Sequence, residues 1–473
     1  MCRKNFGTLP YPFLNSLKMA SKKQEKLFRD PVHNVIHFDL QNAEENLVCR
    51  LIDTDAVQRL RHIQQLGLAS YIYPGAEHSR FGHSLGTAFM ARRLFDSATS
   101  EAGDPFERCV TLCAALLHDI GHSPFSHAFE ASLAGIFPFE HEALTEKLIL
   151  WPEGEIFKVL SSFDATLPEQ VANCIAHREP RWYHNIISSQ LDADRMDYIL
   201  RDGFMTGVRN YMYDSDRIIE MLDSDERGPI VGSRAIQAVE SYLLSRFHMY
   251  QQVYHHKAVR GAEKLIEAIF KRIADLYAAG DESPLSAGPI GEMLANIFQF
   301  SKIDLHNYVH VHDAHAWVAF DIWSHHKDAI LRDLSERILR RKFMKTLEIS
   351  HECLALYPSV IPALSEILQR HGLDARYYLV LDTTSNKAFA PYQPPAAPSL
   401  PFFDDEPKKQ KFINNDDIRI LMPDDRVISI QDASPVVQML TQVKYSTVRV
   451  CFPEEVRDEI VPFLKQKKLV VSC

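Results

Sequence analysis

The chain of 473 residues is 46% hydrophobic and 24% charged, which is typical of a globular protein with a sizeable core. Its formal net charge of −10 argues against a dedicated nucleic-acid-binding protein. No apolar run in the sequence is long enough to cross a bilayer, so we expect no membrane association.

The N-terminal residues 1–25 combine basic side chains with Pro, Asn and Ser, and they lack the continuous apolar segment of a secretory signal. We expect them to form a flexible tail. The eight cysteines are dispersed, and only Cys109 and Cys113 are close neighbours. A metal-binding pair is the alternative, but we interpret these two as small buried side chains in a reducing, cytoplasmic environment.

Helical periodicity dominates from Pro31 to about Gly280. A first amphipathic helix is expected to begin at Asp53 or Thr54. Residues 106–118 form a strongly apolar helical segment, and residues 233–280 predict either two helices or one bent helix. These segments indicate a helical body.

Beyond about residue 370 the pattern changes to short β-branched runs bounded by Pro, Asp and Asn. Residues 422–427 provide a hairpin connection, and residues 388–412 form a proline-rich insertion. We therefore expect a mainly α protein, in which the helical body is followed by a smaller α+β C-terminal lobe at 346–473. The expected strands are 376–382, 417–422, 426–430 and 447–452.

Four residues are candidate metal ligands: His83, His118, Asp119 and Asp194. Two imidazoles and two carboxylates suit a divalent ion such as Mn, Fe, Zn or Mg. His118 and Asp119 would point about 100° apart on a regular helix, but they can converge at a helix end, which Gly121 is expected to supply. Capped core histidines are the alternative for any one of these residues, but not for the whole set.

Other polar side chains of the same region could take part in chemistry. His127 and Glu130 are three residues apart, so on a helix the carboxylate can hold the imidazole in one tautomer, as a general acid or base requires. His122 and His141 are candidates for phosphate binding or proton transfer. Arg80 is a candidate phosphate clamp.

Several ordered segments resemble the HD-superfamily deoxynucleoside triphosphate triphosphohydrolases, or dNTPases. The resemblance is continuous from Lys26 to about Lys264 and weaker in the C-terminal lobe. It implies an HD-domain helical body over residues 26–345, and it favours the branch of the family without a SAM domain. The matching segments are FRDPVHNVIHFD, IDTDAVQRLRHIQQLG, YPGAEHSRFGHSLG, LLHDIGHSPFSHAFE and LDADRMDYILRDG.

The resemblance implies a role for each matching position. Gln65 and Asp202 match contacts to the deoxyribose 3′-hydroxyl, and Tyr254 matches an aromatic residue that leaves no room for a 2′-hydroxyl. The residues that match metal ligands are His83, His118, Asp119 and Asp194. The residues that match catalytic or phosphate-binding positions are His122, His127, Glu130, His141, Arg80, Arg195, Tyr198 and Arg246.

The resemblance also implies two activator sites. Asp53, Gln58 and Arg61 carry donors and acceptors suited to a guanine edge, and with Lys26 they match a guanine-nucleotide site at a subunit interface. A solvated, salt-bridged helix face is the alternative for this group. We expect a homo-oligomer, a dimer that becomes a tetramer with activator. The residues that match a second nucleotide pocket are Asp214, Arg217, His256 and Lys257, whereas Gln252 and Ala238 stand where relatives have Arg and Asn.

Three positions depart from the family pattern. Glu130 replaces the usual Asp beside the catalytic histidine, Asn34 replaces a glycine, and Arg195 replaces a phosphate-binding Lys. Asn adopts left-handed backbone more readily than most residues, and Arg keeps the charge with a different donor geometry. None of the three removes a metal ligand.

The resemblance and the residues together predict metal-dependent hydrolysis of dNTPs, dGTP included, to deoxynucleoside and inorganic triphosphate. The expected cofactor is a divalent metal ion, and the expected ligands are dNTP substrates and a guanine nucleotide activator. Two alternatives stay open. The first is an HD-family phosphohydrolase that acts on another nucleotide, such as a monophosphate or a guanosine alarmone. The second is a nucleotide-sensing or nucleic-acid-binding protein with an inactive site.

Overall fold

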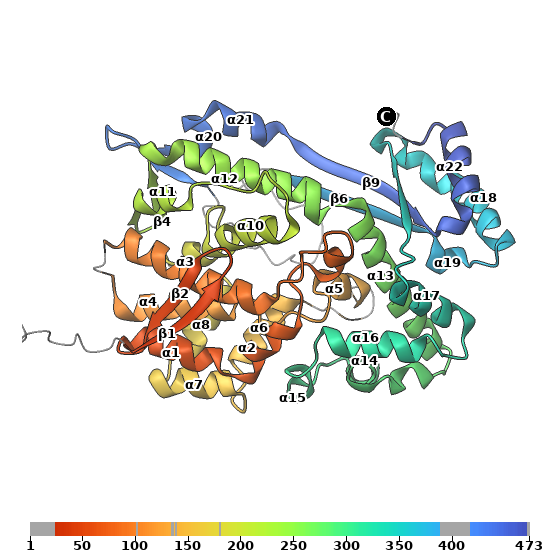
Figure 1. Ribbon diagram of the computed structural model, residues 1–473, viewed down its shortest axis with the longest axis horizontal. Coiled ribbons are helices and arrows are strands. Elements are labelled where there is room, and N and C mark those ends of the chain that lie inside the picture. The colour runs from red at the N-terminus through yellow and green to blue at the C-terminus, as the bar shows by residue number, and fades with distance from the viewer. Residues whose placement is uncertain are drawn as a thin grey trace, which may run out of the picture.

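The computed structural model describes residues 24–100, 103–133, 137, 140–178, 181–387 and 417–470. These residues form a mainly α-helical protein with three small sheets, so the expected fold class is confirmed (Figure 1). The helices are α1 (Ala43–Ile52), α2 (Asp55–Arg59), α3 (Arg80–Ala98), α4 (Pro105–Leu117), α5 (His127–Leu133), α6 (His141–Ile149), α7 (Glu155–Phe163), α8 (Leu167–Ile175), α9 (His184–Ile187), α10 (Ala193–Thr206), α11 (Ser215–Glu220), α12 (Ile236–Met249), α13 (Lys257–Ala278), α14 (Gly288–Phe300), α15 (Leu305–Tyr308), α16 (Asp313–Trp323), α17 (Ala329–Leu339), α18 (Tyr357–Arg370), α19 (Ala375–Tyr378), α20 (Ile430–Ala433), α21 (Pro435–Gln442) and α22 (Arg457–Gln466).

The three sheets are small, with two, three and four strands. β1 and β2 form an antiparallel hairpin, and β5, β9 and β6 form an antiparallel sheet in that order. The third sheet has the order β3–β4–β7–β8, in which β4 and β7 are parallel. The strands are β1 (Glu25–Asp30), β2 (Asn34–Asp39), β3 (Leu222–Asp225), β4 (Gly228–Gly232), β5 (Lys345–Ile349), β6 (Val380–Lys387), β7 (Arg419–Leu421), β8 (Val427–Ser429) and β9 (Lys444–Phe452).

The core of the body surrounds α4, which packs against α1, α3 and α8. Its N-cap Asp104 accepts two backbone N–H groups of the first turn, which satisfies donors that a helix leaves unpaired. Every residue from 109 to 117 is buried, and Cys109 and Cys113 are free thiols within this stretch. Because this helix is covered on all sides, its C-terminal end delivers His118 into the interior of the body.

The long helical segment at 233–280 is two helices rather than one. A π turn at Tyr250–Tyr254 separates α12 from α13, and the backbone N–H of His255 donates to the carbonyl of Tyr250 at 3.0 Å, across five residues. π turns within helices occur frequently at functional sites. This one carries Tyr254.

The β1–β2 hairpin was not expected from the sequence, which predicted a mostly helical body from residue 31 onward. Asp30 Oδ1 accepts the backbone N–H groups of Val32 and His33 at 2.9 and 2.8 Å and so stabilises the turn. Asn34 has φ of 62°, so the expectation that it adopts left-handed backbone is confirmed. Ile36 of β2 is buried against the body, so tertiary packing stabilises a hairpin whose local signal is weak.

The strands expected at 417–422, 426–430 and 447–452 are confirmed as β7, β8 and β9, and the hairpin connection joins β7 to β8. The strand expected at 376–382 is only partly right, because Ala375–Tyr378 form α19 and β6 begins at Val380. Figure 1 shows β6 and β9 running together as a long ribbon along one side of the molecule. Strands of the preceding chain complete both sheets, because β4 pairs with β7 and β5 pairs with β9. The expected boundary at 345/346 therefore falls within β5, and the domain division stays a prediction.

Two expected segments are not part of the described structure. Residues 1–23 of the expected tail and the expected proline-rich insertion at 388–412 lie outside the described residues. Within the described residues, no helix has the length and apolar character needed to span a bilayer.

Candidate active site

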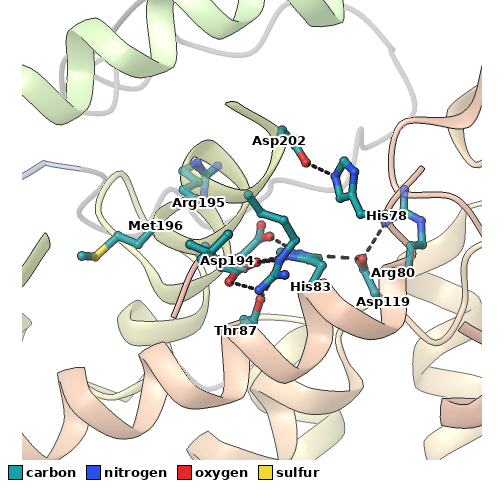
Figure 2. A network of polar contacts seen from close by, with 12 residues as sticks. His78, Arg80, His83, Thr87, Asp119, Asp194, Arg195, Met196 and Asp202 are labelled. Carbon is teal, nitrogen blue, oxygen red and sulfur yellow. Dashed lines mark hydrogen bonds and ion pairs between the residues drawn. The ribbon is translucent and has the colours of Figure 1, made fainter. Parts of the chain in front are cut away.

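Three helices bring the predicted metal ligands together. His83 lies on α3 and Asp194 in the first turn of α10, whereas His118 and Asp119 follow the end of α4. His83 Nε2 is 3.2 Å from His118 Nε2 and 3.0 Å from Asp194 Oδ1. His118 Nε2 is 3.3 Å from Asp119 Oδ1. His83, His118 and Asp119 thus form a cluster that could hold a metal ion. Asp194 lies against this cluster, and Figure 2 shows it beside His83 and near Asp119.

Hydrogen bonds at the other ring nitrogens orient the two imidazoles. His118 Nδ1 donates to the carbonyl of Ala115, and His83 Nδ1 donates to Asp197 Oδ2, each at 2.8 Å. Each ring therefore presents the lone pair of Nε2 to the cluster. Two imidazole nitrogens bound at about 2.1 Å to one ion lie roughly 3.0–3.4 Å apart at right or tetrahedral angles. The observed 3.2 Å matches this spacing, so the donor set fits a divalent cation.

Asp197 is the centre of a buried network that the sequence analysis missed. Its carboxylate is fully buried and accepts hydrogen bonds from His83 and, at 2.7 Å, from His33 Nε2. The guanidinium of Arg201 donates to both carboxylate oxygens at 2.8 and 2.9 Å, and it also donates to Asp30 at 2.7 Å. Burial would raise the pKa of Asp197, but Arg201 and the two histidines hold this pKa well below its usual range.

Gly86 allows α10 to approach α3 closely enough for this network. A Cβ atom at position 86 would lie 1.8 Å from Asp197 Oδ1 and 2.4 Å from Arg201 Nη2. The sequence contains two signals for the network. Asp194, Asp197 and Arg201 are spaced to share one helical face, and a glycine follows His83 by three residues.

Arg80, the predicted phosphate clamp, lies beside the metal cluster. Its Nη1 donates to Asp119 Oδ2 at 2.5 Å, and its Nε donates to Ser126 Oγ at 2.9 Å (Figure 2). Burial would raise the pKa of Asp119, but Arg80 together with His118 and His122 holds this pKa well below its usual range. A ligand carboxylate thus occupies part of the donor capacity of this arginine.

The two histidines predicted to assist catalysis stack on each other. The rings of His122 and His141 are 3.8 Å apart between centroids and nearly parallel. His122 Nε2 lies 3.3 Å from Asp119 Oδ1, and His141 Nδ1 donates to Glu130 Oε1 at 2.8 Å. Glu130 was expected to pair with His127, whose side chain lies outside the described structure. The described partner of Glu130 is His141.

The end of α4 at Leu117 confirms that His118 follows a helix end, but Gly121 acts differently from the expectation. Gly121 is not in the left-handed region. A Cβ atom there would lie 2.1 Å from the carbonyl oxygen of His141 and 2.5 Å from the backbone nitrogen of Thr145. Thr145 Oγ1 donates to the carbonyl of His118 and accepts from Gly121 N, each at 3.0 Å. The glycine therefore permits close packing against α6 rather than chain reversal.

The residues expected to contact deoxyribose gather around His78. His78 Nε2 and Asp202 Oδ1 are 2.7 Å apart, and the Tyr254 hydroxyl donates to Asp202 Oδ2 at 2.8 Å (Figure 2 shows the first contact). Gln65 N donates to the carbonyl of His78 at 3.0 Å, whereas Gln65 Oε1 is buried without a hydrogen-bond partner among the described residues. A buried acceptor is costly to leave unpaired, and a ligand hydroxyl could satisfy it.

Two predicted phosphate-binding arginines lie near Tyr198. Arg195 pairs with Asp192, and Arg246 Nη1 donates to Gln190 Oε1 at 2.8 Å. Burial raises the pKa of the Tyr198 hydroxyl, and both guanidinium groups are close enough to oppose that effect. The arrangement gathers positive charge on one side of the metal cluster, where a polyanion could bind.

The first predicted activator group consists of two contacting pairs. Lys26 Nζ is 2.9 Å from each carboxylate oxygen of Asp53. Arg61 Nε donates to Gln58 Oε1 at 2.8 Å. Asp53 and Arg61 are exposed. This arrangement agrees with an activator site and equally with a salt-bridged helix face.

The second predicted activator group lies at two helix starts. Asp214 caps α11 by accepting from Arg217 N at 2.9 Å, and His256 caps α13, whose first residue is Lys257. In the described part of the chain, no hydrogen bond or ion pair joins Asp214 or Arg217 to His256 or Lys257. The second activator site therefore stays a prediction.

Replacing Asp197 by Asn should weaken metal binding. The amide has one acceptor oxygen where the carboxylate has two, so His83 loses its fixed tautomer and orientation. Loss of such a partner of a ligating histidine typically lowers metal affinity by about 10–100-fold. Calorimetric titration of the metal-free protein with Mn²⁺ or Zn²⁺ would measure the change. Asp382→Asn is the matched control, because Asp382 is a buried carboxylate that pairs with Arg260 instead. Equal affinities in the two variants would contradict the role of Asp197.

Comparisons with known proteins are consistent with this geometry. Residues 80–202 match the HD domain family, and residues 213–284 match the HD associated region. The uncharacterized protein YwfO of Bacillus subtilis is 36% identical over 375 residues, which cover 78% of this chain and 82% of that protein. A Dictyostelium discoideum protein named as a deoxynucleoside triphosphate triphosphohydrolase SAMHD1 homolog is 28% identical over 286 residues. That alignment covers 57% of this chain and 53% of the relative, so the chain spans about half the length of that protein.

A solved structure shares most of the fold. It is described as a phosphohydrolase from Bacteroides thetaiotaomicron, with 27% identity and a TM-score of 0.72, and the alignment covers 91% of this chain and all of that one. All four predicted metal ligands lie within the part that matches the HD domain. Since the Bacillus relative also aligns over most of both chains, this chain belongs to the HD-domain phosphohydrolase family.

Proposed function

We propose that this protein hydrolyses dNTPs to deoxynucleosides and inorganic triphosphate. The observation that carries the proposal is the adjacency of three features. The metal cluster at His83 adjoins positive charge at Arg80 and Arg195, and through Tyr198 it adjoins the hydrogen-bonded pair of Asp202 and Tyr254. A triphosphate requires the first two features, and a deoxyribose requires the third. The dNTP triphosphohydrolase names of several relatives support the same substrate class.

The phosphates would be bound by positive charge. Arg80, Arg195 and Arg246 would neutralise the triphosphate and stabilise the negative charge that develops during attack at the α-phosphorus. The residues that would hold a divalent ion are His83, His118, Asp119 and Asp194. Such an ion lowers the pKa of a water molecule and polarises a phosphate oxygen.

A histidine would supply the proton for the leaving group. His127, the first residue of α5, would protonate the leaving 5′-oxygen, a contribution of about 10²–10⁴-fold in rate for general acids. Glu130 holds His141 in one tautomer, and His141 stacks on His122. These two rings would bind phosphate oxygens or relay the proton.

The reaction is tested by incubating the purified protein with each dNTP, singly and mixed, with Mg²⁺ or Mn²⁺, and identifying the products. Asp119→Ala and Asp194→Ala should abolish turnover and lower the bound-metal content, because each removes a negatively charged ligand. His127→Ala should lose turnover and retain its metal. Free triphosphate would support the proposal, and orthophosphate or pyrophosphate would show a different nucleotide hydrolase. Nucleotide binding without any turnover would indicate a sensor.

Selection against ribose is attributed to Tyr254. Its hydroxyl is fixed by Asp202, and burial keeps the pKa of this phenol well above its usual value, so the hydroxyl stays a donor. A 2′-hydroxyl would find neither space nor a partner beside this ring. Tyr254→Ala should therefore raise NTP hydrolysis relative to dNTP hydrolysis, whereas Tyr254→Phe should keep most of the discrimination. Comparable hydrolysis of ATP and dATP by the unmodified protein would refute this gate.

Guanine nucleotides are proposed as activators that stabilise a tetramer of this chain. Asp53 can accept from a guanine edge and Arg61 can donate to one, and a ligand that binds only the oligomer must favour it. GTP or dGTP should then raise dTTP hydrolysis and the sedimenting mass. Asp53→Ala should lose both effects and keep its metal. The matched control is Asp424→Ala, since Asp424 also forms an exposed pair, with Arg426 at 2.7 Å. If guanine nucleotides changed neither the sedimenting mass nor the rate of dTTP hydrolysis, the activator sites would be refuted and the protein would be an unregulated hydrolase.

A further inference from the structure

Two buried charges of opposite sign flank the loop that carries the metal ligands. Arg59, at the end of α2, and Asp313, at the start of α16, are 4% and 6% exposed. In the described part of the chain neither forms an ion pair; each is held by backbone groups instead. Both residues lie outside the segments that match the HD domain and its associated region.

Arg59 ties the first half of the loop to the segment before α16. Its Nη2 donates to the carbonyl of Ile120 at 2.5 Å, and its Nη1 donates to the carbonyl of Val311 at 2.8 Å. The Tyr308 ring lies 4.8 Å from the guanidinium carbon, and the Tyr308 hydroxyl donates to the carbonyl of Gly121 at 2.7 Å. The carbonyls of two consecutive residues after Asp119 are thereby held in place.

Asp313 ties the second half of the loop to the segment that carries Gln65. One carboxylate oxygen accepts Phe125 N at 3.1 Å, and the other accepts Gln64 N at 2.9 Å. Phe125 and Ser126 have φ of 54° and 51°. Consecutive non-glycine residues in this region are strained, and they persist only where their surroundings hold them.

We propose that Arg59 and Asp313 are positioning residues that hold residues 120–126, and through them the start of α5 at His127, in the geometry needed for reaction. Burying a charge without a counter-ion is unfavourable, and an apolar side chain would fill the same volume at lower cost. The two charged side chains orient backbone carbonyl and N–H groups, which an apolar side chain could not do. Only the kinetic test of this proposal depends on the proposed function, because it measures dNTP hydrolysis.

The direct test is amide hydrogen exchange followed by mass spectrometry on the full chain. Asp313→Asn keeps the shape, but the amide can accept from only one of the two backbone N–H groups. Loss of one hydrogen bond should speed exchange in the peptide covering 120–126 by about tenfold. The matched control is Asp328→Asn, because Asp328 caps α17 and pairs with Arg272. This control should leave exchange in 120–126 unchanged.

The second test separates positioning from general stability. Asp313→Asn should retain bound metal, and its kcat on dNTPs should fall about tenfold or more with a smaller change in KM, because displacements of about 1 Å cost up to 10²-fold in rate. Arg59→Met should behave similarly, and Arg59→Lys should recover part of the loss because Lys keeps the charge and one donor direction.

The outcomes are distinguishable. The positioning role would be overturned if hydrogen exchange in residues 120–126 were the same in Asp313→Asn as in the wild type. It would also be overturned if the wild type were active and Asp313→Asn had the same kcat per folded molecule. If the wild type hydrolyses no dNTP, the proposed function fails, and the exchange measurement still decides the role of Arg59 and Asp313.

Discussion

The carboxylate of Asp197 has to stay ionised in a fully buried position, and much of the surrounding architecture follows from that requirement. A buried charge is stable only where donors surround it. His33 supplies one donor from the β1–β2 hairpin, His83 supplies one from α3, and Arg201 supplies two from α10. A single charge therefore joins three elements that are distant in sequence, and Gly86 is required because any side chain there would occupy the same space.

The density of histidines in the metal region has a related explanation. An imidazole is costly to bury unless both ring nitrogens have partners. His83 and His118 each place Nδ1 on a fixed acceptor, which leaves Nε2 for the cluster. His141 uses Nδ1 on Glu130 and stacks its face on His122. Outer hydrogen bonds thus fix the orientation of side chains that would otherwise be costly to bury.

The sequence predicted the residues with intrinsic chemistry better than the residues that support them. The candidate metal ligands were recognisable because few residue types bind metal ions. The C-terminal strands were recognisable because Pro, Asp and Asn bounded short runs of β-branched residues. The β1–β2 hairpin was missed because its stability comes from packing and from the contact between His33 and Asp197. Asp197 was missed because its spacing from Asp194 and Arg201 marks one face of a helix but does not say whether that face is buried or exposed. The pairing of Glu130 with His141, eleven residues away, depends on how α5 and α6 meet, which helical spacing alone does not contain.

The π turn before α13 has a consequence for how this chain can change during evolution. Such a turn accommodates one residue more than an α-helical path would, and each residue of an α-helix contributes about 100° of rotation and 1.5 Å of rise. Tyr254 closes the turn, and His256 and Lys257 begin the next helix immediately after it. A single-codon deletion here would rotate both the Tyr254 ring and the basic start of α13. An insertion or deletion in this stretch would therefore affect Tyr254 and the start of α13 together. Homologues that carry one should differ from this chain at both places.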